Sequence, residues 1–165
     1  MLWILIAALA CTKDEGTDTD SGQDSADTAD TVDTGVLENA VFMTALVAAN
    51  TSGDQDEADQ FEDWVKLSNL GDEPADLGGM GLSDGYPEEQ PWILPELTLA
   101  PGDSVRIWCD DDESDGELHA NFKLSRAGEV LTLLSADGAV LDRVSWTELE
   151  ADEVYVRSDD GWEVE

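Results

Sequence analysis

Residues 61–69 read FEDWVKLSN and contain the clearest secondary-structure signal of the chain. The apolar side chains of Val65 and Leu67 alternate with Trp64 and Lys66. A period of two residues is typical of a β-strand that has one face buried and the other in water. The stretch therefore predicts a half-buried strand and not a helix.

Similar short segments continue along the chain, and turn residues separate them. The turns are expected at 71–74 (GDEP), 101–103 (PGD) and 136–138 (ADG), and Asp-Gly in the last of these is a strong hairpin signal. No segment predicts a convincing helix. Short strands with turns about every 8–12 residues indicate an all-β sandwich or barrel. The other expected strands are 41–47, 77–84, 104–109, 119–124, 128–135, 140–146 and 154–157, with a loop or edge strand at 87–95.

The N-terminus reads MLWILIAALAC and predicts a signal peptide over residues 1–11. Its apolar run is shorter than the roughly 20 residues of a membrane span, but it suits the core of a secretory signal. The sequence Ala8-Leu9-Ala10-Cys11 resembles a bacterial lipobox, which makes Cys11 the expected lipidation site and first mature residue. A plain signal peptide cleaved elsewhere, or a disordered N-terminus, is the alternative.

Residues 12–35 (TKDEGTDTDSGQDSADTADTVDTG) are rich in Asp, Thr and Ser and contain no aromatic residue. Such a segment cannot bury enough apolar area to offset the entropy of ordering, so we expect a disordered acidic linker. The linker would hold a folded domain, residues 36–165, away from a membrane. Because Thr12 and not Asp follows Cys11, we expect the bacterial outer membrane, on its periplasmic or surface side, as the location in the cell envelope.

The composition restricts the partners of the protein. Seven Lys and Arg face 40 Asp and Glu, a formal net charge of −33. Nucleic-acid binding requires cationic side chains that neutralise phosphates, so we expect no nucleic-acid partner. Divalent cations, basic proteins or cationic polymers suit this charge better. No catalytic motif is apparent, and the single histidine, His119, is expected to have a structural or hydrogen-bonding role.

Two acidic segments, 54–59 and 110–116, are the sequence's candidates for cation binding. Ca²⁺ prefers six to eight oxygen ligands from carboxylates and carbonyls, which each segment could supply in part. The favoured interpretation is two solvated acidic loops without a bound ion or cofactor, and Ca²⁺ binding is the alternative. The candidate Ca²⁺ ligands are Asp54, Asp56, Asp59, Asp110, Asp111 and Asp112.

Two tryptophans are candidates for a contact surface. Trp108 lies on the same predicted strand face as Arg106, opposite the apolar face that contains Ile107 and Cys109, and is therefore expected to be exposed. Trp92 lies in the proline-bearing segment and is the second candidate, with packing in the core or at its rim as its alternative. Cys109 is expected to be a small buried apolar residue.

The order of several motifs resembles the lamin tail domain family. DWVKLSN (63–69), with Gly71 and ADL (75–77) after it, is similar to the family's opening, and GLSD (81–84) to its next step. WILP (92–95) with LAPG (99–102), and LHANFKLS (118–125) with GEVLTL (128–133), follow in the family's order. The resemblance covers roughly residues 38–162. It implies an immunoglobulin-like β-sandwich that serves as a binding or structural module and has no catalytic activity.

The resemblance and the N-terminus together predict a non-catalytic cell-envelope lipoprotein. It would present its domain to a protein or an envelope polymer and contact the membrane through its lipid anchor. The alternative is a Ca²⁺-dependent adhesive or carbohydrate-binding module that uses the acidic loops.

Overall fold

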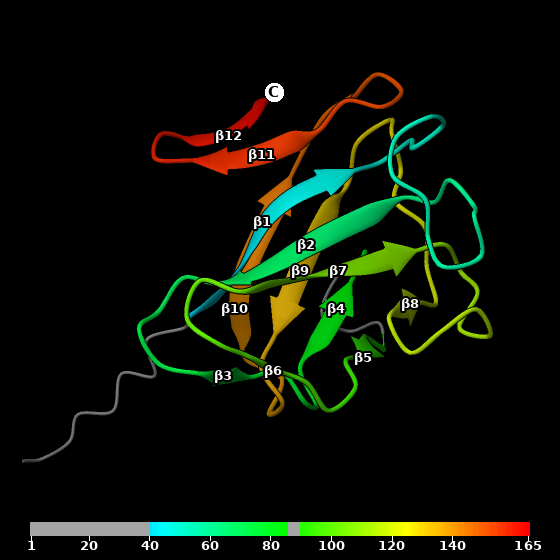
Figure 1. Cartoon of the computed structure of the whole chain (residues 1–165). Coiled ribbons are helices and arrows are strands. Elements are labelled where there is room, and N and C mark those ends of the chain that lie inside the picture. The colour runs from blue at the N-terminus through cyan, green and yellow to red at the C-terminus, as the bar shows by residue number, and fades with distance from the viewer. Residues whose placement is uncertain (1–39, 86–89) are drawn as a thin grey trace, which may run out of the picture. The chain divides into compact units, whose positions relative to one another are not determined.

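The computed structural model describes residues 40–85 and 90–165, which belong to one compact unit, Val36–Glu165. Within these residues the chain forms strands and no helix (Figure 1). The strands are β1 (Val41–Val47), β2 (Trp64–Asn69), β3 (Ala75–Asp76), β4 (Gly81–Ser83), β5 (Trp92–Ile93), β6 (Thr98–Leu99), β7 (Ser104–Cys109), β8 (His119–Ala120), β9 (Val130–Leu134), β10 (Val140–Ser145), β11 (Tyr155–Ser158) and β12 (Gly161–Val164).

Two sheets lie face to face, with β9 and β10 running behind β1 and β2 (Figure 1). The larger sheet has the order β12-β11-β1-β2-β7-β8, and the second has the order β10-β9-β4-β5. Strands β3 and β6 form a separate small pair. Neighbouring strands are antiparallel except β7 and β8, which are parallel. The predicted all-β, immunoglobulin-like sandwich is confirmed.

The core lies between the two sheets and is built from the alternating apolar residues. Val65, Leu67 and Ile107 of the larger sheet face it and are fully buried, whereas Lys66 is only partly buried. The second sheet contributes Leu82, Leu131, Leu133 and Val144 to the same cluster. Because the two inner faces interdigitate, a period of two residues in the sequence becomes one continuous core.

A smaller apolar cluster lies on the outer face of the larger sheet. A β-bulge between Met43 and Ala45 shifts the register of β1, so Met43 faces the core whereas Ala45 joins the second cluster. Trp64 and Trp108 are paired across β2 and β7 and form the centre of this cluster. The expected exposure of Trp108 is therefore wrong: Trp108 is only 7% exposed because Val154 and Val156 pack against the cluster from outside the core.

The positions of the turns match the sequence predictions more closely than the bounds of the short strands do. Gly138 (φ 86°) closes the predicted hairpin between β9 and β10, and Gly102 (φ 80°) lies in the turn before β7. The predicted strand 77–84 is instead interrupted, because Met80 N–H bonds to Leu77 C=O in a turn, at 3.0 Å. Of the predicted strand 119–124, only β8 has strand structure.

The predicted signal peptide (1–11), with the lipidation site Cys11, and the predicted linker (12–35) lie outside the described residues. No helix in the described part of the chain has the length and apolar character needed to cross a membrane.

Candidate functional site

Two acidic loops meet beside one another at one end of the larger sheet (Figure 1). The first connects β1 to β2 and contains Asp56, and the second connects β7 to β8 and contains Asp110 and Asp115. His119 is the first residue of β8. Each of these four residues offers one potential ligand atom, and the four atoms lie within 4.8 Å of one another. We call Asp56, Asp110, Asp115 and His119 the Asp–His cluster.

The parallel pairing of β8 with β7 brings His119 into the cluster. Trp108 is the pairing partner of His119, and the centroids of their rings are 6.4 Å apart. His119 Nδ1 lies 2.5 Å from Asp110 Oδ2, while Asp110 Oδ1 accepts a hydrogen bond of 3.0 Å from Asp112 N–H. Both side chains are buried, so this hydrogen bond fixes the orientation of the imidazole ring away from water.

Asp56 organises its own loop with one oxygen and leaves the other without a partner. Asp56 Oδ1 accepts hydrogen bonds from Ala58 N–H at 2.9 Å and from Gln60 N–H at 2.7 Å. Asp56 Oδ2 is buried and has no hydrogen-bond partner, and the residue is only 8% exposed. Gln60 also donates its side-chain N–H to Asp115 Oδ2 at 3.0 Å and thereby connects the two loops.

The second nitrogen of His119 is also without a hydrogen bond. Nε2 is buried and lies 3.3 Å from Glu57 Oε1, but the geometry is not that of a hydrogen bond. Burial lowers the pKa of His119, but the hydrogen bond and charge of Asp110, with Glu57, outweigh it and raise the pKa overall. Gly116 packs against the ring: a Cβ there would lie 3.0 Å from His119 Cδ2 and 2.7 Å from Glu57 Oε1.

Further carboxylates make the surroundings of the cluster strongly negative. Burial is the main cause that raises the pKa of Glu62, and Lys123, whose Nζ lies 4.0 Å from Glu62 Oε2, opposes it. The charges of Asp110, Asp63 and Asp56 raise it further. A cation placed among these groups would therefore be attracted by more carboxylates than those that contact it.

The structure brings together only two of the six candidate Ca²⁺ ligands, Asp56 and Asp110. The other four have different surroundings: Asp54 pairs with Arg106 at 2.6 Å, Asp112 accepts bonds from Ser114, and Asp59 and Asp111 are exposed residues with positive φ. Acidic spacing alone did not indicate Asp115 or His119 as ligands. The available signals were that Asp115 belongs to the same acidic run and that His119 is the only histidine. The hydrogen-bonding role expected for His119 is confirmed by its contact with Asp110.

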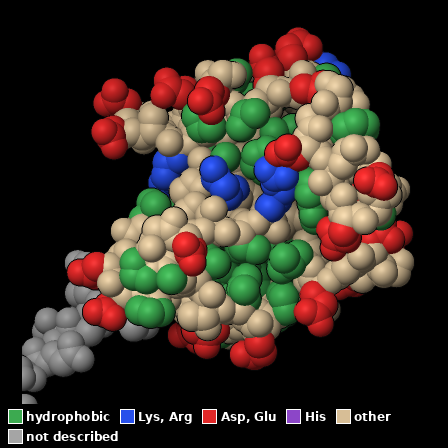
Figure 2. All heavy atoms as spheres, viewed as in Figure 1, with side chains coloured by type: hydrophobic (Ala, Val, Ile, Leu, Met, Phe, Trp, Pro, Cys, Tyr) green, Lys and Arg blue, Asp and Glu red, His purple; other side chains and the backbone are tan. Residues whose placement is uncertain are grey.

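The expected aromatic contact surface is not present on the described part of the molecule. Trp92 is 5% exposed in the main core, in agreement with its alternative interpretation, and Trp108 is buried in the second cluster. Arg106 lies over the rings of Trp64 and Trp108, at 4.4 and 5.1 Å from their centroids. Figure 2 shows Lys and Arg side chains gathered on this face of the larger sheet, with acidic side chains around its edge.

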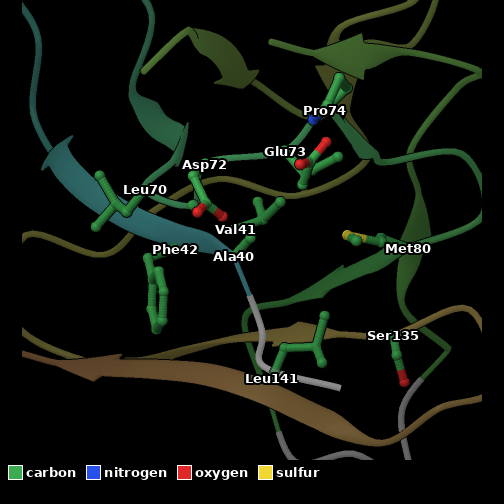
Figure 3. Close-up of a pocket in the computed structure, with 12 residues that line it drawn as sticks. Ala40, Val41, Phe42, Leu70, Asp72, Glu73, Pro74, Met80, Ser135 and Leu141 are labelled. Carbon is green, nitrogen blue, oxygen red and sulfur yellow. The ribbon is translucent and has the colours of Figure 1, made fainter. Parts of the chain in front are cut away.

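An open apolar pocket of about 580 Å³ is a second candidate site (Figure 3). Phe42 and Leu70 form one side of it, and Met80 and Leu141 form the other. Leu70 is 58% exposed, the highest exposed fraction among the large apolar side chains of the described residues. An apolar group of a binding partner could therefore pack in this pocket.

Cys109 has the expected structural role. Its side chain is free and fully buried in the main core. Burial raises the pKa of the Cys109 thiol well above its usual value, and the neighbouring Asp63 and Asp110 raise it further. The thiolate, which is the reactive form, is therefore disfavoured.

A family model described as Lamin Tail Domain matches residues 37–148. The match contains β1 to β10 and ends before β11 and β12. A search of curated proteins found no match to this chain.

Proposed function

The chain belongs to the lamin tail domain family, and from this we propose that it is a non-catalytic cell-envelope lipoprotein whose sandwich binds a protein or an envelope polymer. The immunoglobulin-like fold of the family is generally that of a structural or binding module. The family match is the observation that carries the proposal. The high negative charge of the chain supports it further by disfavouring nucleic acid as the partner.

The apolar pocket is the part of the surface that best suits such a contact. Exposed apolar groups in a polar surround often mark binding sites, because their burial against a partner removes apolar area from water. Asp72 and Glu73 lie at the pocket beside Leu70. We therefore propose a partner that inserts an apolar group and places a cationic group next to it.

Site-specific photo-cross-linking in the native cells tests this contact. A photoreactive residue at Leu70 should capture one defined envelope component, whereas the same residue at Ile93 should not. Ile93 is a matched control because it is 55% exposed but lies in β5 of the other sheet. Equal capture at both positions, or capture at neither, would contradict the proposal.

The lipid anchor is a separate part of the proposal and rests on the sequence Ala8-Leu9-Ala10-Cys11. Metabolic labelling with a fatty-acid analogue should mark the protein, and Cys11→Ser should abolish the label and release the protein from the membrane fraction. A Cys11→Ser protein that remains in the membrane fraction would contradict lipid anchoring at this residue.

A second candidate function is a Ca²⁺-dependent adhesive or carbohydrate-binding module. The proximity of Asp56 and Asp110 favours it, because hard cations prefer carboxylate oxygens. Titration with Ca²⁺ followed by glycan binding tests this function. It fails if millimolar Ca²⁺ produces neither heat nor a shift in the melting temperature.

A further inference from the structure

The unsatisfied groups of the Asp–His cluster require a physical reason. Most buried polar atoms in proteins have a hydrogen-bond partner, and a buried polar atom without one costs about 1–3 kcal/mol. In the described part of the chain, the buried side-chain atoms without a partner are Asp56 Oδ2 and His119 Nε2. Both belong to residues of the same cluster, so a single bound group can account for both.

A bound cation would satisfy both atoms at once. A carboxylate oxygen and an imidazole nitrogen both present lone pairs, so neither can satisfy the other without a proton or a metal ion between them. The surrounding carboxylates would stabilise the charge of such an ion.

The chemistry of the donors distinguishes between metals. Ca²⁺ and Mg²⁺ bind oxygen ligands, whereas an imidazole nitrogen with carboxylates suits Zn²⁺ and related transition-metal ions. Ligand atoms at about 2.0–2.2 Å from a tetrahedral Zn²⁺ lie about 3.3–3.6 Å apart. The potential ligand atoms of the cluster lie within 4.8 Å of one another, so the carboxylates would move toward a bound ion to reach that separation.

The hydrogen bond between Asp110 and His119 supports the same conclusion. Histidines that bind metals usually donate their other N–H to a carboxylate or carbonyl, which fixes the tautomer and the orientation of the ring. Here Asp110 Oδ2 lies 2.5 Å from Nδ1, and Nε2 has no hydrogen-bond partner. The partly exposed Asp115 and the exposed Glu57 provide a path for an ion from solvent.

We propose that Asp56, Asp115 and His119 Nε2 bind a divalent transition-metal ion of the zinc class, while Asp110 orients the imidazole ring through Nδ1. The ion would join the loop between β1 and β2 to the loop between β7 and β8. This site is separate from the apolar pocket, so its test and the cross-linking test can fail independently.

The experiment is a titration of the metal-free full chain with Zn²⁺, read by calorimetry and by ¹H–¹⁵N NMR of the imidazole. His119 is the only histidine, so the spectrum reports this ring alone. We expect one saturable site, a change of the ligating nitrogen's ¹⁵N shift, and a higher melting temperature, because Zn²⁺ would bind the folded state. Ca²⁺ should leave the imidazole shifts unchanged.

Asp56→Asn and Asp111→Asn are matched variants that each remove one negative charge. Asn at position 56 keeps the Oδ1 acceptor for Ala58 and Gln60, and Asn at position 111 tolerates the positive φ of 60° there. Asp56→Asn and His119→Gln should weaken Zn²⁺ binding at least about tenfold, as removal of supporting groups at metal sites commonly does. Asp111→Asn should not change it.

The acidic segment 12–35 and Cys11 are present in every variant, so their contribution to Zn²⁺ binding cancels in the comparison. Unchanged imidazole shifts at saturating Zn²⁺ would overturn the proposal. So would equal losses of affinity in Asp56→Asn and Asp111→Asn, because they would indicate diffuse attraction by the acidic surface. If His119→Gln does not fold, Asp56→Asn and the NMR titration of the unmodified chain still decide the outcome.

Discussion

Asp142 and Asp110 each contact a nitrogen-bearing side chain, but the groups around them differ in how completely they are hydrogen-bonded. Asp142 of β10 accepts bonds from Arg157 Nη2 at 2.6 and 2.5 Å and from Met43 N–H at 2.9 Å, while Arg157 Nε donates to Met43 C=O at 2.8 Å. We call Asp142, Arg157 and Met43 the clasp. In the Asp–His cluster, by contrast, Asp56 Oδ2 and His119 Nε2 have no hydrogen-bond partner. A satisfied buried set can stabilise a fold, whereas an unsatisfied one costs stability unless a ligand completes it.

The largest expected effect is the loss of the clasp. Asp142→Ala should lower the free energy of unfolding by about 2–4 kcal/mol, because Arg157 keeps a partly buried charge and Met43 N–H loses its acceptor. The clasp joins β10 of one sheet to β1 and β11 of the other, so the loss should appear in the cooperative transition. Urea denaturation monitored by tryptophan fluorescence measures it.

A double-mutant cycle tests whether the charge pair is the cause. Asp142→Ala combined with Arg157→Ala should cost less than the sum of the two single changes, because no unpaired charge remains. Additive losses would mean that the two side chains stabilise the sandwich independently, and the comparison with the Asp–His cluster would lose its basis.

Glu129 is an intermediate case, a partly buried acid with one hydrogen-bond donor. Burial raises the pKa of Glu129 to about 7; the Ser125 N–H, at 2.7 Å, lowers it, and the charges of Asp84 and Asp63 raise it further. In the unfolded chain its pKa returns to 4.5. The folded state therefore binds the proton more tightly, and this stabilisation is complete below pH 4.5 and lost as the pH rises to about 7.

Glu129→Gln should thus stabilise the protein at pH 8 but not at pH 4. The expected gain at pH 8 is about 1–2 kcal/mol, after allowance for the partial exposure of the side chain. Chemical denaturation at the two pH values measures the difference between variant and parent. An equal effect at both pH values would contradict the raised pKa and point to altered packing.

In metal-free protein, Asp56→Asn should have a smaller effect, opposite in sign to that of Asp142→Ala. Asn keeps the loop bonds of Oδ1 and removes one charge from a strongly acidic surround, so we expect a gain below about 1 kcal/mol. Thermal unfolding in the presence of a chelator measures it. A loss comparable to that of Asp142→Ala would show that Asp56 stabilises the fold without any ligand.

The core strands could be predicted from the sequence because the patterns that form them involve residues close together in the chain. Alternation at Val65 and Leu67, and the turns at Gly102 and Gly138, depend on neighbouring residues, and the structure confirms them. The family motif around Asn69 also has a local reason. The Asn69 side chain is fully buried and bonds Glu73 C=O, Leu99 C=O and Gly71 N–H, so it ties the turn after β2 to β6.

What the sequence did not predict depends on contacts between distant residues. The burial of Trp108 requires Val154 and a bulge in β1, neither of which changes the alternation within β7. The Asp–His cluster requires two loops to converge and β8 to pair in parallel with β7. Acidic composition therefore indicated that cations suit the protein, but it could not select the residues that lie together.

The smallest expected effect comes from an ion pair at the surface. Arg126 Nη2 lies 3.8 Å from Glu148 and 3.6 Å from Glu150, and the three side chains are 50–74% exposed. Solvent screens such pairs, and ordering the long side chains offsets the attraction, so Glu148→Gln should change the free energy of unfolding by less than about 0.5 kcal/mol. Urea denaturation under the conditions used for Asp142→Ala measures it. An effect as large as that of Asp142→Ala would show that charge, and not burial with complete hydrogen bonding, distinguishes the clasp. A negligible effect would show that the large effect of Asp142→Ala comes from burial and complete hydrogen bonding of the aspartate and not from its charge alone. Complete hydrogen bonding is also what distinguishes the clasp from the Asp–His cluster.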